Sequence, residues 1–229
     1  MEEDFLEKNA LVYDKERFNG YMIKATNKIL SLIDKYKVNK NRMLEIGVGT
    51  GELIKKTEPM FKEAYGIDLS KNMVGVARNK VKKAHLLVGD AEHLMFKAES
   101  FDFVVSMDIL EHVGDPLKVM NEVIRVLKNR GLAFLSTPNP LWAPVMWLAE
   151  KLHLKVKEGK HKYIFLPKYA KRLSNADVLY SGYVAYLPFR FNSRIEESLS
   201  RFLLTKYLGF NFMLVIKKKA TPPIEKTSG

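Results

Sequence analysis

The sequence predicts an α/β protein built on a doubly wound, mostly parallel sheet. Between residues 43 and 137, short apolar runs alternate with amphipathic helical patterns five times. A glycine-rich turn follows the first run, and glycines or acids stand at four of the five strand ends. Ligands of such sheets bind outside the carboxyl ends of the strands, so we expect the functional site there.

The first strand and its turn are the most informative stretch. Residues 43–47 form the strand, and residues 52–58 a helix that stops near Pro59. The glycines at 47, 49 and 51 depart from the dinucleotide fingerprint Gly-x-Gly-x-x-Gly, because the third comes one residue early and Glu52 takes its place. Glu45 would repel a pyrophosphate but suits an ammonium or sulfonium ligand. The pattern therefore disfavours a nicotinamide dinucleotide.

The remaining elements of this half are predicted from periodicity and from helix start and stop residues. The strands are residues 64–68, 85–90, 101–108 and 132–137, and the helices are 70–80 and 117–127. Asp68 ends the second strand, where one carboxylate can accept hydrogen bonds from two vicinal ribose hydroxyls. Asp90 ends the third strand, where it also suits the N-cap of a short helix at 92–94.

The two ends of the chain carry further predicted elements. Residues 5–37 are expected to be helical. After residue 140 we expect helices at 141–154, 166–174 and 195–208, a loop at 158–162, strands at 178–187 and 210–217, and a frayed tail.

Charge is divided unevenly along the chain. The net charge is +12, yet residues 1–150 hold 22 basic and 21 acidic residues, whereas residues 151–229 hold 16 and 5. The cationic third fits an anionic partner such as phospholipid headgroups, nucleic acid or a phosphorylated substrate, although a lysine-rich surface also serves solubility. With no cysteine, the chain has no disulfide, thiolate metal site or cysteine nucleophile. The N-terminus lacks the features of a signal peptide, and a cytoplasmic protein is expected.

The stretch Glu45-x-Gly-x-Gly-x-Gly51, with acids at the next three strand ends, resembles the class I S-adenosylmethionine-dependent methyltransferases over about residues 40–140. The resemblance implies a seven-stranded Rossmann-like sheet with an antiparallel last strand and a helical insert after strand five. It implies one domain over 1–229: a helical cap at 1–40, a cofactor-binding core at 41–140, a substrate-side insert with the last two strands at 141–217, and a flexible tail at 218–229. The implied contacts to S-adenosylmethionine are Glu45, Gly47, Gly49, Gly51, Asp68, Leu69, Asp90, Ala91, Met107 and Asp108. Asp90 would accept from the adenine amino group.

A narrower resemblance points to the ubiquinone-biosynthesis O-methyltransferases. Residues 107–113, the stretch Ser-Thr-Pro-Asn at 136–139, the apolar insert after it and the glycine–histidine turn at 157–161 are similar to that group. It implies O-methylation of a small or lipid-like acceptor, with peripheral membrane contact through 141–157. The same segment also suits a lid helix packed over the substrate entrance.

A hydroxyl acceptor benefits from a base or a metal that lowers its pKa. His112 is the first candidate base and His161 the second. Asp108, Glu111 and His112 have the composition of a Mg²⁺ site, although the same trio occurs in methyltransferases without a metal. Tyr13 is a candidate lid contact, or an aromatic packed under a helix.

Two other functions stay open at this point. One is an RNA (tRNA) methyltransferase whose basic C-terminal third binds phosphates. The chain has no Asn-Pro-Pro-Tyr-like tetrad after strand four, which argues against methylation of adenine or cytosine amino groups. The other is a non-catalytic protein that binds S-adenosylmethionine.

Overall fold

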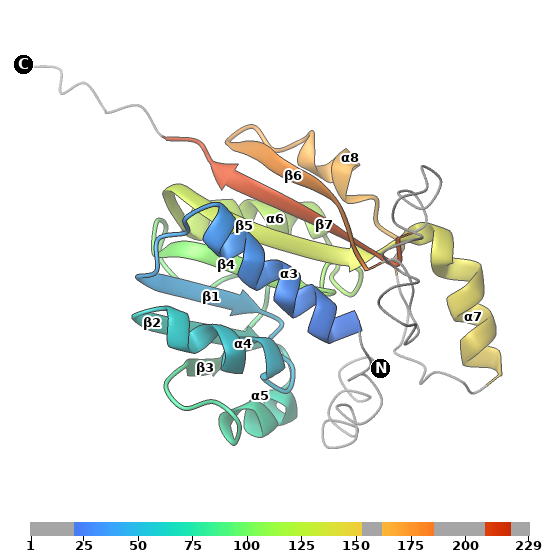
Figure 1. Ribbon diagram of the computed structural model, residues 1–229, viewed down its shortest axis with the longest axis horizontal. Helices are drawn as coiled ribbons and strands as arrows, with labels where there is room; N and C mark the ends of the chain where they lie inside the picture. The colour runs from blue at the N-terminus through green and yellow to red at the C-terminus, as the bar shows by residue number, and fades with distance from the viewer. Residues whose placement is uncertain (1–20, 153–161, 186–208, 221–229) are drawn as a thin grey trace, which may run out of the picture.

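The computed structural model describes residues 21–152, 162–185 and 209–220. Within these residues, seven strands form one sheet in the order β3-β2-β1-β4-β5-β7-β6 (Figure 1). The strands are β1 (Arg42–Ile46), β2 (Glu63–Asp68), β3 (His85–Val88), β4 (Phe101–Met107), β5 (Leu127–Pro138), β6 (Ala176–Ala185) and β7 (Asn211–Lys218). Strands β1 to β5 pair in parallel, and β7 runs antiparallel to both of its neighbours.

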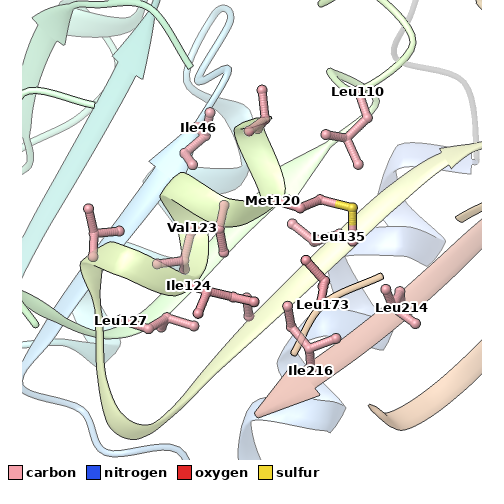
Figure 2. Packing of buried hydrophobic residues seen from close by; sticks show 14 of the residues in the cluster. Ile46, Leu110, Met120, Val123, Ile124, Leu127, Leu135, Leu173, Leu214 and Ile216 are labelled. Carbon is pink, nitrogen blue, oxygen red and sulfur yellow. The ribbon is translucent and has the colours of Figure 1, made fainter. Parts of the chain in front are cut away.

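Helices cover both faces of the sheet. They are α3 (Tyr21–Lys35), α4 (Glu52–Thr57), α5 (Lys71–Arg78), α6 (Pro116–Val126), α7 (Ala143–Lys151) and α8 (Leu166–Ala170), with short 3₁₀ turns η1 (Glu58–Met60) and η2 (Pro140–Trp142). Helices α3 and α4 pack with Met43 and Phe103 on one face. Helices α6 and α8 pack on the other face, where Figure 2 shows Met120, Val123 and Ile124 of α6 against Leu135. The strand interiors are therefore apolar on both sides, as in a parallel sheet between helical layers.

The predicted fold is confirmed: a mostly parallel seven-stranded sheet with an antiparallel final strand and helices inserted after strand five. The antiparallel arrangement brings the start of β7 to the edge where β1, β4 and β5 end. The first residues of β7 therefore lie at the predicted site edge.

Several element bounds differ from the prediction. Strand β5 begins at Leu127 rather than 132, because Phe101 pairs with Leu127 and Phe103 with Leu132, and the residues between leave the ladder. Arg130 takes a left-handed backbone there, with φ 63°. Residues 128–131, which separate the predicted helix 117–127 from the predicted strand 132–137, are thus an irregularity inside a longer strand.

The helix predicted at 166–174 is shorter in the structure, and the one predicted at 92–94 is missing. Helix α8 ends at Ala170, because the amides of Arg172 and Leu173 bond three residues back and tighten into a turn. Residues 92–94 form a turn instead of a helix. The predictions at 5–20, 153–161 and 195–208, which include Tyr13 and His161, lie outside the described residues.

Candidate functional site

The turn after β1 is shaped by its glycines and by β2. The amides of Gly47 and Val48 both donate to Ile67 O at 2.8 Å, which ties the turn to the second strand. Gly47 has φ 75°, and an added Cβ would overlap the side chain of Ile109. Gly49 has φ 50°, yet no atom lies within 4 Å of an added Cβ. The turn therefore presents bare backbone to an open space, as a cradle for a ligand requires.

Asp68 holds this turn in place. Its Oδ2 accepts from the Gly49 amide at 2.8 Å, and its Oδ1 accepts from the Ser70 amide at 3.0 Å. The side chain is largely buried, and Gly89 N donates to Asp68 O at 2.9 Å, which brings the end of β3 alongside. A carboxylate oxygen can accept more than one hydrogen bond, so the chemistry of Asp68 is compatible with ribose hydroxyls as further donors. The sequence did not indicate this support of the glycine turn.

Glu45 is a buried acid with one carboxylate oxygen that lacks a hydrogen-bond partner. Its side chain is 4% exposed, and Oε2 has no hydrogen-bond partner. Burial raises the pKa of Glu45 well above its usual range, and the nearby negative charge of Asp68 raises it further. A cationic group that binds beside Glu45 would satisfy the carboxylate. This arrangement agrees with the preference for an ammonium ligand expected from the sequence.

Asp90 lies on the more open side of the candidate site. Its Oδ1 accepts from Glu92 N at 2.8 Å, and its Oδ2 lies 3.0 Å from His93 Nδ1. Burial alone would raise the pKa of Asp90, but the Glu92 amide and the His93 ring lower it below its usual value. Asp90 therefore caps a turn, and its carboxylate remains charged. Leu69 is 56% exposed and Ala91 half-buried beside these strand ends.

Asp108, at the end of β4, is hydrogen-bonded to residues of two other strands, β5 and β7. It has a left-handed backbone, with φ 54°, and its amide donates to Ser136 O at 3.2 Å. Its Oδ1 accepts from the Ser136 hydroxyl at 3.1 Å and from Asn211 Nδ2 at 2.6 Å. Such conformations persist only where the surroundings enforce them, and they are concentrated at functional sites. Met107, the preceding residue, is buried.

Asn211 is a site residue that the sequence analysis missed. It is fully buried at the start of β7, and its Oδ1 has no hydrogen-bond partner. The available signal was one amide residue inside the apolar run 210–216. Only the antiparallel placement of β7 brings it to Asp108.

The loop after β4 carries His112. The amide of His112 donates to Ile109 O at 2.9 Å. The neighbouring Glu111 is buried, and its Oε2 accepts from the Thr137 hydroxyl at 3.1 Å. Among the described residues, no three histidine, aspartate or glutamate side chains gather in a geometry that could hold a metal ion. The Mg²⁺ hypothesis for Asp108, Glu111 and His112 is therefore not supported, because the two carboxylates turn toward neutral donors.

A cavity of about 550 Å³ lies between the turn at 92–94 and the start of α6. It adjoins Asp90 through His93 rather than facing the glycine turn. Its acids Glu92, Asp115 and Glu122 already accept hydrogen bonds from backbone amides. The glycine turn is the better candidate for a cofactor site, because Glu45 Oε2 has no hydrogen-bond partner and the space beside Gly49 is open.

Helix α7 projects beyond the end of β5 and away from the sheet (Figure 1). Its segment exposes Leu141, Val145, Trp147, Leu148 and Leu152, with exposed fractions between 44% and 62%. Lys151 Nζ lies 4.4 Å from the Trp147 ring centroid. In the part of the chain that the structure describes, no helix is long and apolar enough to cross a membrane.

Sequence comparison finds similarity to methyltransferases. Residues 44–135 match the family model described as a methyltransferase domain. The chain is 24% identical over 219 residues to a ubiquinone biosynthesis O-methyltransferase of Hydrogenovibrio crunogenus, covering 91% of this chain and 88% of that protein. It is 32% identical over 115 residues to a demethylmenaquinone methyltransferase of Thermotoga maritima, covering 49% of each chain.

The fold also resembles solved structures. A crystal structure of an S-adenosylmethionine-dependent methyltransferase from Thermotoga maritima superposes with a TM-score of 0.66 at 20% identity. The match covers 93% of this chain and 98% of that one. At this level of identity, the likeness concerns the fold.

Proposed function

We propose that this chain, whose residues 44–135 match the methyltransferase-domain family model, is a class I S-adenosylmethionine-dependent methyltransferase that methylates a hydroxyl oxygen of a small or lipid-like acceptor. The observation that carries this proposal is the exposed apolar segment of α7, which follows directly from the end of β5 at the cofactor edge of the sheet. The likeness to a ubiquinone biosynthesis O-methyltransferase along most of the chain supports it.

The residues at the strand ends fit the cofactor. Bound S-adenosylmethionine supplies an electrophilic methyl group. Glu45 would face its ammonium group, Asp68 would accept from the ribose hydroxyls and Asp90 from the adenine amino group. The glycine turn, with Gly47, Gly49 and Gly51, would lie against it, and Leu69, Ala91, Met107 and Asp108 would border it. These ten residues remain predictions for binding experiments.

His112 is the proposed general base. Removing the proton of an acceptor hydroxyl makes its oxygen a better nucleophile, and an imidazole is suited to this near neutral pH. The chain's own contribution is then to bind and orient the acceptor and to exclude water. Chelation with EDTA should leave turnover unchanged, because the carboxylates of Asp108 and Glu111 already accept from neutral donors.

The test of the proposal is transfer of a labelled methyl group. We would incubate the full chain with labelled S-adenosylmethionine and a panel of catechols and prenylated phenols, and identify products by mass spectrometry. His112→Ala should reduce turnover by about 10²–10⁴-fold and leave cofactor affinity nearly intact. Full turnover by this variant would remove His112 as the base. Label on nitrogen or carbon alone would overturn O-methylation.

Membrane contact through 141–157 is part of the same proposal. The exposed apolar side chains of α7, together with Lys151, suit the boundary between the headgroups and acyl chains of a membrane. The full chain should float with anionic vesicles, and Trp147→Ser with Leu148→Ser should reduce flotation. The matched control is Leu179→Ser, which changes an exposed leucine on β6. Equal flotation of all three proteins would contradict this role of α7.

The positive charge of residues 151–229 favours RNA as the alternative acceptor. A gel-shift assay with tRNA at two salt concentrations tests it beside the vesicle assay. Tight, salt-dependent RNA binding with label transfer to RNA, and no methylation of the phenols, would favour the alternative over the proposal.

A further inference from the structure

One residue contacts the loop after β4 on both sides of His112. Lys162 N donates to the carbonyl oxygen of Glu111, the residue before His112, at 3.0 Å. Val113 and Gly114 are the two residues after His112. Lys162 Nζ donates to Val113 O at 3.1 Å and to Gly114 O at 2.8 Å. Lys162 is therefore bonded to the residue before and the two residues after the candidate base.

These contacts are of a kind that holds a turn in shape. The carbonyl groups at the end of a helical turn lack partners within the turn, and a lysine ammonium satisfies them well. Hydrogen bonds from a charged donor are roughly twice as strong as those between neutral groups. The backbone bond at Glu111 O adds an anchor that does not depend on the side chain.

Thr137 and Glu92 hold the same loop at other groups. The Thr137 hydroxyl binds the Glu111 side chain, and Glu92 Oε1 accepts from Gly114 N and Asp115 N. They fix the side chain of Glu111 and the end of the loop. Lys162 fixes the peptide groups that flank His112.

We propose that Lys162 is a positioning residue that holds the loop at 111–114 so that His112 faces the methyl acceptor. The proposal rests on the proposed role of His112 as the base. Lys162 lies 48 and 49 residues beyond the carbonyls that its side chain binds. It joins the substrate-side insert to the catalytic loop, so the insert can influence turnover without contacting the acceptor.

The test compares Lys162→Met, which removes the ammonium, with Lys162→Arg, which retains a charged donor. Lys168→Met is the matched control, because Lys168 is an exposed lysine on α8 in the same part of the chain. Amide hydrogen exchange is followed in peptides that cover residues 108–116. The reporters are the amides of His112, Gly114 and Asp115, which are hydrogen-bonded in the native loop.

In Lys162→Met, these amides should exchange with solvent about fivefold faster than in the native chain. In Lys162→Arg and in the control, their exchange rates should match those of the native chain. With an acceptor from the phenol panel, Lys162→Met should lower kcat about tenfold without changing the affinity for S-adenosylmethionine. Lys162→Arg should restore most of kcat. A residue needed only for overall stability would instead lower the melting temperature and leave kcat unchanged at low temperature.

The outcomes separate this inference from the proposed function. Unchanged exchange in Lys162→Met overturns the positioning role, whatever the native chain methylates. Faster exchange with unchanged kcat overturns the link to His112. If the native chain methylates none of the phenols, the proposed function fails, while the exchange measurement still decides whether Lys162 holds the loop.

Discussion

At the scale of single residues, the site is built from acids with different environments. Asp68 accepts hydrogen bonds from two backbone amides, whereas Glu45 is buried with one oxygen lacking a hydrogen-bond partner. Asp90 is half-exposed and paired with His93. The sequence shows these as similar acids near strand ends. Their different roles follow from the donors that the folded chain places around each carboxylate.

Asp68→Ala should weaken binding of S-adenosylmethionine by about 1–3 kcal/mol, or roughly 5- to 150-fold in Kd. The variant loses the ribose contacts and also frees the Gly49 amide, so the glycine turn becomes less ordered. Isothermal titration calorimetry measures the change. Asp177→Ala, an exposed acid on β6, is the control and should bind normally. An unchanged Kd in Asp68→Ala would contradict the ribose assignment.

Glu45→Gln should make the ligand-free protein more stable at neutral pH. Burial and Asp68 raise the pKa of Glu45 in the folded state, so above the unfolded pKa the folded chain holds more protons than the unfolded chain. Stability from this group therefore falls as pH rises from the unfolded pKa to the folded one. Gln removes that penalty. In thermal melts from pH 4 to pH 8, the difference in melting temperature between Glu45→Gln and the native chain should widen as pH rises. A constant difference would refute the explanation.

At the scale of elements, an acid in a short 3₁₀ turn organises the loop before β3. Glu58, in η1, is 3% exposed and accepts from the amides of Lys82, Lys83 and Ala84 at 2.8–3.0 Å. Burial alone would raise the pKa of Glu58, but these three donors and the charge of Lys83 lower it overall. One side chain thus satisfies the amides that lead into the third strand.

Glu58→Gln should lower the free energy of unfolding by about 1–2 kcal/mol at pH 7. Because the folded pKa is depressed, the stability contributed by Glu58 is present above the unfolded pKa and is lost as pH falls through the folded pKa. Urea unfolding at pH 7 and near pH 3 should show the difference shrinking in acid. Asp34→Asn, which breaks an exposed pair with Lys40, should change stability by less than about 1 kcal/mol. Equal effects of the two variants would contradict the buried role.

Local sequence predicted most elements because the apolar spacing and the end signals agree. Ser70 caps α5 by accepting from Met73 N, and Asp115 caps α6 before Pro116, as such residues do at helix starts. The start of β5 was missed because a turn-like stretch, Lys-Asn-Arg-Gly, lies inside its pairing with β4. Pairing between distant strands decided that bound, and local propensity does not encode it.

At the scale of the whole molecule, the sheet is completed by the last described strand. Strand β7 inserts between β5 and β6, and Met213, Leu214, Val215 and Ile216 are buried on its two faces. Burying side chains of this size contributes about 1.5–3 kcal/mol each, while domains are stable by only about 5–15 kcal/mol. The fold therefore depends on a segment far along the chain from the cofactor motif.

A chain ending at residue 208 should fail to fold cooperatively, whereas one ending at 220 should melt like the full chain. The shorter chain leaves an unpaired edge on β5 and exposes the apolar faces of the core. Circular dichroism melts and size-exclusion chromatography compare the three proteins. A cooperative transition at the native temperature in the 208-residue chain would show that β7 is dispensable.

The sequence by itself determined the α/β class, the glycine turn and the acids near the strand ends, because these depend on periodicity and backbone freedom within a few residues. Only the tertiary structure decided that Asn211 reaches Asp108, that Lys162 contacts the loop around His112 and that Glu45 is left without a partner for one oxygen. Each of these depends on segments far apart in the chain meeting at one sheet edge. Hydrogen bonds across such separations follow from strand order and direction, which no local pattern encodes.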